Sequence, residues 1–196
     1  FAEIIFMNYF SSDFTLGILG GGQLGKMLLQ VTSKLSIKTN ILDPNKDSPC
    51  KNLCNEFTNG NLMDFNSVYE FGKKCDIVTF EIEHVNIEAL EKLEADGITV
   101  YPRPKTLKII QDKSLQKQFF IDNKIPTANF WYFKSFEDFQ KSSFKDEISF
   151  PCVWKKTKFG YDGYGVEIIK SSQEIEDLRV LRRGKMRQYM KFQILN

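Results

Sequence analysis

The sequence predicts an α/β fold in two parts: a parallel, Rossmann-like sheet over residues 14–104, then an incomplete α+β domain over residues 105–196. Two observations lead to this prediction. Short apolar strands alternate with helical segments through the first half. In the second half, a glycine-rich hairpin lies between two β-prone stretches. We expect residues 1–13 to be an N-terminal extension of the first part.

The first part contains four expected strands. They lie at Thr15–Leu19, Ile37–Leu42, Asp76–Phe80 and Ile98–Tyr101. The helix after the first strand has apolar residues at helical spacing, which we expect to pack on the sheet: Leu24, Met27, Leu28 and Val31. A second helix, containing Ile87, Leu90 and Leu93, precedes the fourth strand. This alternation favours parallel strands.

The second part begins with a helix expected from about Leu107 to Asn123, which Pro126 ends. Further elements follow in order: a strand at Ala128–Phe133, a helix start at Ser135, strands at Cys152–Lys156 and Val166–Ile169, and a capping box at Ser171–Glu174. We expect the chain to end before the second sheet is complete.

Composition and charge place few limits on function. With 42% hydrophobic and 27% charged residues, the chain is typical of globular proteins. A net charge of +2 gives no general reason to expect nucleic acid or a membrane as a partner. No apolar run approaches the roughly 18 residues that cross a bilayer, so we expect a cytoplasmic protein. The basic residues after Asp177 favour a solvated helix face over a nucleic-acid patch.

The first candidate site is the loop Gly20-x-Gly22-x-x-Gly25 between a strand and a helix. A helix N-terminus offers unpaired N–H groups to a phosphate. Asp43, 18 residues after Gly25, ends the next strand where a ribose-binding acid lies in NAD enzymes. An NAD-dependent oxidoreductase and a purely structural turn therefore both remain open, although Gln23 favours polar recognition.

The second candidate site follows the third strand, where Glu81 and Glu83 alternate onto one face. Open α/β sheets bind ligands at this end of their strands. The two carboxylates could bind sugar hydroxyls or an amine, or act as a base. Alternatively, Glu83 caps the helix that begins near Asn86. His84 is expected in an exposed loop rather than in a catalytic triad.

The third candidate site is the hairpin that contains Gly160, Tyr161, Asp162, Gly163 and Gly165. Its glycines allow backbone N–H groups to approach a bulky anion. Lys155 interrupts the apolar strand before the hairpin, where a cation needs a partner, and an anionic ligand would supply one. Lys113, expected in the middle of a helix, would by itself be interpreted as a surface lysine.

The four cysteines give little support for chemistry. Cys50 and Cys54 have the wrong spacing for a zinc knuckle, and one histidine is available to assist them. We expect free thiols and no metal site in this chain.

Taken together, these motifs resemble the ATP-grasp superfamily and, within it, the family of N5-carboxyaminoimidazole ribonucleotide synthases. The resemblance covers Leu16 to about Ile169. It rests on the order and spacing of six motifs: Gly20–Gly25, Leu42-Asp43-Pro44 with Ser48-Pro49-Cys50, Thr79–Glu83, Asp112-Lys113 with Gln116-Lys117, Ile125-Pro126-Thr127, and Val153–Gly165.

The resemblance implies a preATP-grasp domain that binds aminoimidazole ribonucleotide through Gly22, Gln23, Leu24 and Glu81. It implies that Lys113 and Lys155 contact the phosphates of ATP and that Gly160–Gly165 forms a lid. Family members use ATP and Mg²⁺ to convert bicarbonate to carboxyphosphate, which carboxylates the exocyclic amine in purine biosynthesis. A homodimer is also a family expectation.

The same resemblance implies that this chain is the N-terminal portion of such an enzyme. The magnesium-binding acids of the ATP-grasp fold belong to the part that is not in the sequence, so we expect the chain alone to be inactive. A non-catalytic nucleotide-binding remnant remains the alternative.

Overall fold

The computed structural model describes residues 13–141, 147–158, 165–174 and 192–195. The chain divides into two compact units, residues 1–108 and 109–196. No helix among the described residues combines the length and the apolar character needed to cross a membrane.

A parallel sheet forms the centre of the first unit. Within its described residues, the strand order is β3-β2-β1-β4-β5. The strands are β1 (Thr15–Leu19), β2 (Lys38–Asp43), β3 (Glu56–Asn59), β4 (Ile77–Phe80) and β5 (Thr99–Val100). In the β1–β2 register, Ile18 pairs with Ile41 and Leu19 with Leu42. The structure therefore confirms the predicted parallel Rossmann-like sheet and adds β3 to it.

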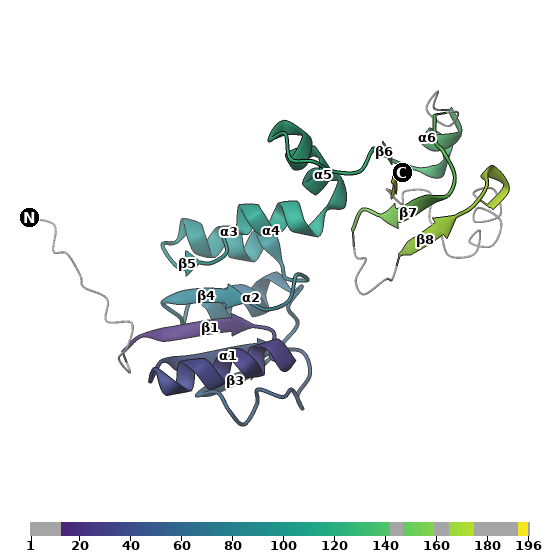
Figure 1. The fold of residues 1–196 in the computed structure, drawn as a ribbon. Helices are drawn as coiled ribbons and strands as arrows, with labels where there is room; N and C mark the ends of the chain where they lie inside the picture. Colours follow the sequence, from purple (N-terminus) through teal and green to yellow (C-terminus); the bar gives the residue numbers. More distant parts are fainter. Residues whose placement is uncertain (1–12, 142–146, 159–164, 175–191, 196) are drawn as a thin grey trace, which may run out of the picture. The chain divides into compact units, whose positions relative to one another are not determined.

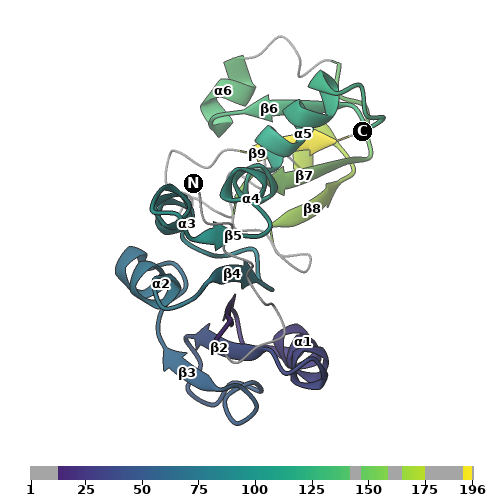
Figure 2. The same ribbon diagram turned by 90° about the vertical axis from the view of Figure 1, so that its left-hand side faces the viewer.

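Helices cover both faces of this sheet. They are α1 (Gln23–Lys34), α2 (Phe65–Gly72) and α3 (Ile87–Ala95). In Figures 1 and 2, α1 lies against one face, whereas α2 and α3 lie against the other. Alternate residues along each strand supply the two cores: Ile18 and Ile41 pack with Leu29 of α1, and Leu19 and Leu42 pack on the opposite side.

The predicted packing face of α1 is wrong for three of its four residues, whereas the fourth, Leu28, is partly buried against the core. Leu24, Met27 and Val31 are between 54% and 61% exposed, whereas the buried residues of α1 are Gly25, Leu29 and Thr32. Gly25 explains the difference. A Cβ at Gly25 would lie 2.9 Å from the carbonyl oxygen of Gly20, so the helix approaches the strand end through the face that carries this glycine.

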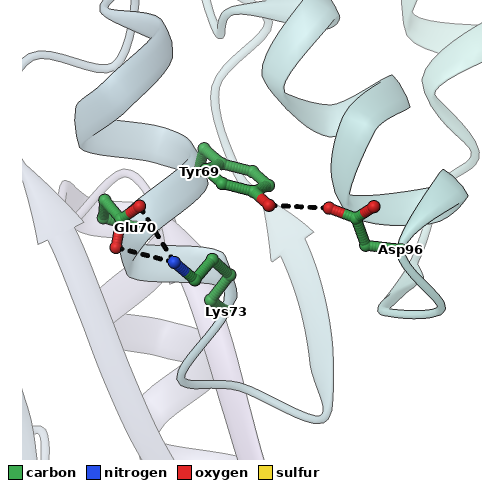
Figure 3. Close-up of polar contacts among 4 residues, drawn as sticks. All are labelled: Tyr69, Glu70, Lys73 and Asp96. Atoms are coloured by element: carbon green, nitrogen blue, oxygen red, sulfur yellow. Dashed lines mark hydrogen bonds and ion pairs between the residues drawn. The ribbon is translucent and has the colours of Figure 1, made fainter.

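A polar cluster joins α2 to the end of α3 on the surface of the first unit (Figure 3). The hydroxyl of Tyr69 donates to Oδ2 of Asp96 at 2.7 Å. The ammonium of Lys73 lies 3.0 Å from Oε1 of Glu70 and 5.1 Å from the centroid of the Tyr69 ring. Since these partners satisfy one another, we assign the cluster a structural role.

The second unit is built on an antiparallel sheet. Among its described residues, the strand order is β6-β9-β7-β8. The strands are β6 (Phe130–Phe133), β7 (Cys152–Lys156), β8 (Val166–Ile169) and β9 (Phe192–Leu195). One face is buried around Phe133, Cys152, Trp154 and Ile169, with Phe139 from α6 (Phe136–Lys141) packed on it. The α+β prediction is therefore confirmed, and β9 is added.

The single helix expected over residues 107–123 is wrong. The structure has two helices, α4 (Pro104–Gln111), which spans the boundary between the units, and α5 (Lys113–Asp122). Asp112 separates them with extended backbone and caps α5 through its side chain, which accepts from the N–H of Ser114 at 3.0 Å. Lys113 therefore begins a helix instead of lying within one.

The two predicted helix caps of the second unit fall on described residues. The hydroxyl of Ser135 accepts from the N–H of Asp138 at 3.1 Å, as expected for the start of α6. The hydroxyl of Ser171 accepts from the N–H of Glu174 at 3.4 Å. Most of the helix predicted to follow Ser171 lies outside the described residues.

Candidate functional site

The glycine loop of the first unit connects β1 directly to α1. Gly20 has a φ of +101°, which side chains rarely allow, and its N–H donates to the carbonyl of Leu42 at 2.9 Å. A Cβ at Gly20 would lie 2.8 Å from Cγ of Glu81. The loop therefore requires glycine at this position and lies in direct contact with the end of β4.

Two carboxylates bind consecutive N–H groups of this loop. The N–H of Gly21 donates to Oδ2 of Asp43 at 2.6 Å, and the N–H of Gly22 donates to Oε1 of Glu81 at 2.9 Å. The structure thus brings together two of the predicted substrate-binding residues, Gly22 and Glu81. Together with Asp43, they form one polar cluster at the carboxyl ends of β1, β2 and β4.

Asp43 is not placed to bind a ribose. Its side chain is 9% exposed, and its second oxygen, Oδ1, accepts from the N–H of Asn45 at 2.7 Å. Because the residue is buried and each oxygen already accepts a hydrogen bond from the protein backbone, this arrangement disfavours Asp43 as the ribose-binding acid of an NAD site.

Residues after β2 also hold the loop, and we predicted no role for them. The hydroxyl of Ser48 donates to the carbonyl of Gly21 at 2.5 Å. The N–H of Cys50 donates to the same carbonyl at 3.2 Å, and its thiol lies 3.7 Å from the carbonyl of Gly22. The signal in the sequence was the Ser48-Pro49-Cys50 motif, but its spacing gives no indication of which loop it contacts.

The other residues predicted for the first unit have varied positions. Gln23 and Leu24 are exposed in the first turn of α1, directly after Gly22. Glu83 is exposed and does not cap α3, because Asn86 does so by accepting from the N–H of Ala89 at 2.8 Å. His84 is half-buried rather than exposed. Substrate binding by Gln23 and Leu24 stays a prediction.

In the second unit, α5 and the hairpin are held at the end of β7. The N–H of Lys113 donates to the carbonyl of Thr157 at 2.8 Å, two residues beyond Lys155. The N–H of Lys156 donates to the carbonyl of Gly165 at 2.9 Å and closes the base of the hairpin. Gly165 has a φ of +75°, which explains a glycine there. Gly160, Tyr161, Asp162 and Gly163 lie outside the described residues.

Asp112 belongs to one of the quoted motifs, but no role was predicted for it. Its side chain is 8% exposed, and its Oδ2 lies 3.5 Å from the ammonium of Lys158. The same carboxylate also caps α5. Asp112 therefore ties the start of α5 to the exit of β7.

The thiols and acids of the described residues do not form a metal or nucleophile site. Burial raises the pKa of Cys75 to about 12 and that of Cys50 to about 11, the opposite of what a reactive thiolate needs. Within the described ranges, no three His, Cys, Asp or Glu side chains are grouped to hold a metal ion.

Comparison with known families agrees with this arrangement. Residues 118–191 match the ATP-grasp domain, a class of nucleotide-binding fold. Residues 14–111, half of the chain, match the ribonucleotide synthetase preATP-grasp domain, and the chain belongs to that family.

The chain is also similar to curated enzymes. The chain is 38% identical over 168 residues to phosphoribosylaminoimidazole carboxylase of Candida glabrata, covering 83% of this chain and 29% of that protein. It is 31% identical over 176 residues to N5-carboxyaminoimidazole ribonucleotide synthase of Staphylococcus epidermidis, covering 87% and 45%. The chain therefore spans less than half the length of these relatives.

Solved structures are similar as well. Carboxyaminoimidazole ribonucleotide synthase of Aspergillus clavatus, complexed with ATP, has a TM-score of 0.82 at 28% identity, over 96% of this chain and 48% of that one. The Aspergillus clavatus enzyme in complex with ADP and 5-aminoimidazole ribonucleotide has a TM-score of 0.77 at 27% identity, over 92% and 46%.

Proposed function

We propose that the protein containing this chain carboxylates 5-aminoimidazole ribonucleotide at the expense of ATP. Bicarbonate attacks the γ-phosphorus of ATP to form carboxyphosphate and ADP. The exocyclic amine of the ribonucleotide then attacks the carboxyl carbon, and phosphate leaves. The observation that carries the proposal is the contact of Gly22 with Glu81 in a chain that matches both domains of these ligases.

The first unit would bind the ribonucleotide. Glu81 uses Oε1 to hold the Gly22 N–H, and its residue is half-buried at the end of β4. A carboxylate at this position can accept hydrogen bonds from an amine or from sugar hydroxyls. Gly22, Gln23 and Leu24 follow one another at the start of α1, where the N–H groups of a helix favour an anionic group. A sugar phosphate supplies both groups: hydroxyls that donate to Glu81 and an anionic phosphate for the start of α1.

The second unit would bind the triphosphate. Lys155 projects from β7, and Lys113 begins α5 where the backbone meets the end of the same strand. Positive charge near the transferred phosphoryl group stabilises the charge that develops on its oxygens. ATP with Mg²⁺ is the expected cofactor, and the described residues include no group of three His, Cys, Asp or Glu side chains that could hold the metal.

Titrations with ATP and NADH distinguish two alternatives to the proposed carboxylation. An NAD-dependent oxidoreductase is disfavoured because both oxygens of Asp43 are bound inside the protein. A nucleotide-binding remnant would bind ATP without turnover. A homodimer and a cytoplasmic location stay predictions from the resemblance and the composition.

The test is ADP release by protein expressed from the complete reading frame. We expect release that requires both bicarbonate and 5-aminoimidazole ribonucleotide and that falls at least about tenfold in Lys155→Met, the loss of one charge-assisted contact. In titrations of the 196-residue chain, ATP should bind and NADH should not. ATP binding without ribonucleotide-dependent ADP release would contradict the proposed carboxylation and support the non-catalytic nucleotide-binding remnant.

A further inference from the structure

Strand register places Lys155 on the less buried face of the second sheet. Lys155 pairs with Val166, and Val153 pairs with Ile168. Side chains of directly paired residues share a face, and alternate residues lie on opposite faces. Trp154 and Ile169 are buried in the core, whereas Val166 and Ile168 are 36% and 67% exposed. Lys155 therefore lies on the face opposite that core.

Phe130 of β6 lies on the same face as Lys155. It pairs with Leu195 of β9, and Leu195 pairs in turn with Val153 of β7. The ammonium of Lys117 reaches this face from α5 and lies 5.7 Å from the centroid of the Phe130 ring.

The ammonium of Lys117 is held in place by neutral groups. It donates to the hydroxyl of Thr127 and, at 3.4 Å, to the carbonyl of Ala128. An ammonium has three N–H groups, so these two contacts leave one for another acceptor.

Lys117 and Lys155 influence each other electrostatically. Partial burial lowers the pKa of Lys117, and the positive charge of Lys155 lowers that pKa further. Among the described residues, the ion pairs of this unit involve Lys141 and Lys158, and neither Lys117 nor Lys155 is paired with a carboxylate. Two like charges held together without an acid produce a local positive potential that an anion would relieve.

We infer that Lys117 is a further cationic residue of the phosphate site, fixed by Thr127, Ala128 and Phe130 so that its remaining N–H and an N–H of Lys155 serve one polyphosphate group. The inference rests on the ATP site of the proposed function and adds to it a residue for which the sequence predicted no role. Lys113 then contributes a third positive charge from the start of the same helix.

The inference is tested by binding of inorganic tripolyphosphate to the 196-residue chain, measured by calorimetry with ATP and adenosine alongside. Lys117→Met should lower the affinity for tripolyphosphate and for ATP about tenfold or more, the effect expected for the loss of one charge-assisted hydrogen bond. Adenosine binding should not change. The exposed Lys134, changed to Met, removes the same charge elsewhere and should leave both affinities within twofold of wild type.

Further variants distinguish direct contact of Lys117 with the anion from a purely structural role of its hydrogen bond to Thr127. Thr127→Val removes the hydroxyl that Lys117 binds but keeps the ammonium, and it should retain most of the affinity. Lys117→Arg should restore part of it. A Lys117→Met protein that binds tripolyphosphate as well as wild type does would overturn the inference, as would Thr127→Val with the full loss.

A measurement on the unchanged protein covers the case in which Lys117→Met does not fold. In NMR of the lysine side chains, tripolyphosphate should raise the pKa of Lys117, because an anion favours its charged form. An unchanged Lys117 signal at saturation would contradict the inference. If the Lys117 signal shifts but ribonucleotide-dependent ADP release is absent, the result supports the phosphate site and contradicts the proposed carboxylation.

Discussion

The backbone N–H of Gly22 donates to Oε1 of Glu81 at 2.9 Å and so connects residues 59 positions apart in the sequence. The bond joins the loop after β1 to the end of β4. With the bond from Gly21 to Asp43 at 2.6 Å, it makes the loop a rigid junction of three parallel strands. A ligand at this junction would meet groups that are already in position.

Replacement of Glu81 should separate its structural role from its proposed binding role. Glu81→Gln keeps an oxygen that can accept from Gly22, so we expect a loss of stability below about 1 kcal/mol. Glu81→Ala should cost about 1–3 kcal/mol, because the N–H of Gly22 loses a charged acceptor. Both variants should lower the affinity for 5-aminoimidazole ribonucleotide at least about tenfold, the effect expected when a charge-assisted contact is lost. Urea unfolding and ligand titration measure the two effects, with exposed Glu94→Gln as the control.

Gly20 and Gly97 form a matched pair for testing the junction. Both have positive φ, +101° and +92°. A Cβ at Gly97 has no neighbour within 4 Å, whereas one at Gly20 would displace the Glu81 side chain. Alanine should therefore cost about 1–2 kcal/mol at Gly97, from backbone strain, and clearly more at Gly20. Equal losses in urea unfolding would mean that Glu81 moves aside without cost.

Asp112 should be important for the stability of the second unit. Asp112→Ala removes the cap of α5 and the partner of Lys158, and we expect a loss of about 1–2 kcal/mol. Asp112→Asn keeps an oxygen for the Ser114 N–H and should lose less than half of that. Thermal unfolding followed by the fluorescence of Trp131 and Trp154 reports on this unit. An alanine variant as stable as the asparagine variant would contradict the capping role.

Stability of the first unit should decline in alkali because of Cys75. Burial raises the pKa of this thiol from 9.0 to about 12 in the folded state. Above pH 9 the unfolded chain loses the proton and the folded chain keeps it, so stability falls as pH rises, by at most about 1.4 kcal/mol per pH unit. Urea unfolding at pH 7, 8.5 and 10 should show a steeper decline for wild type than for Cys75→Ala. Parallel curves would assign the decline to other groups.

Three strands were predicted best because each is a short run rich in apolar residues. Thr15–Leu19, Cys152–Lys156 and Val166–Ile169 were predicted with the observed bounds. By contrast, β3 has a single apolar residue, Phe57, and gives no strand pattern. The orientation of α1 was missed because close approach at Gly25, which has no side chain, outweighs the apolar spacing of Leu24, Met27 and Val31.

The candidate site was predictable as a set of residues but not as a set of contacts. Gly22 and Glu81 were both selected from their local motifs, yet their bond depends on the neighbouring positions of β1 and β4. Asp43 was a candidate ribose-binding acid under the NAD alternative from its spacing, and in the structure it accepts from backbone N–H groups instead. Lys117 belongs to the motif Asp112-Lys113 with Gln116-Lys117 but was given no role, since its surroundings come from residues ten or more positions away.

The position of β9 between β6 and β7 has a consequence for synthesis of the chain. On the ribosome, β6 and β7 emerge tens of residues before the strand that must separate them. Until Phe192–Leu195 leaves the exit tunnel, both hold unpaired hydrogen-bonding edges that can join each other or a neighbouring nascent chain. Slow translation or chaperone capture just before this point would therefore change the yield of native protein without altering a single native contact.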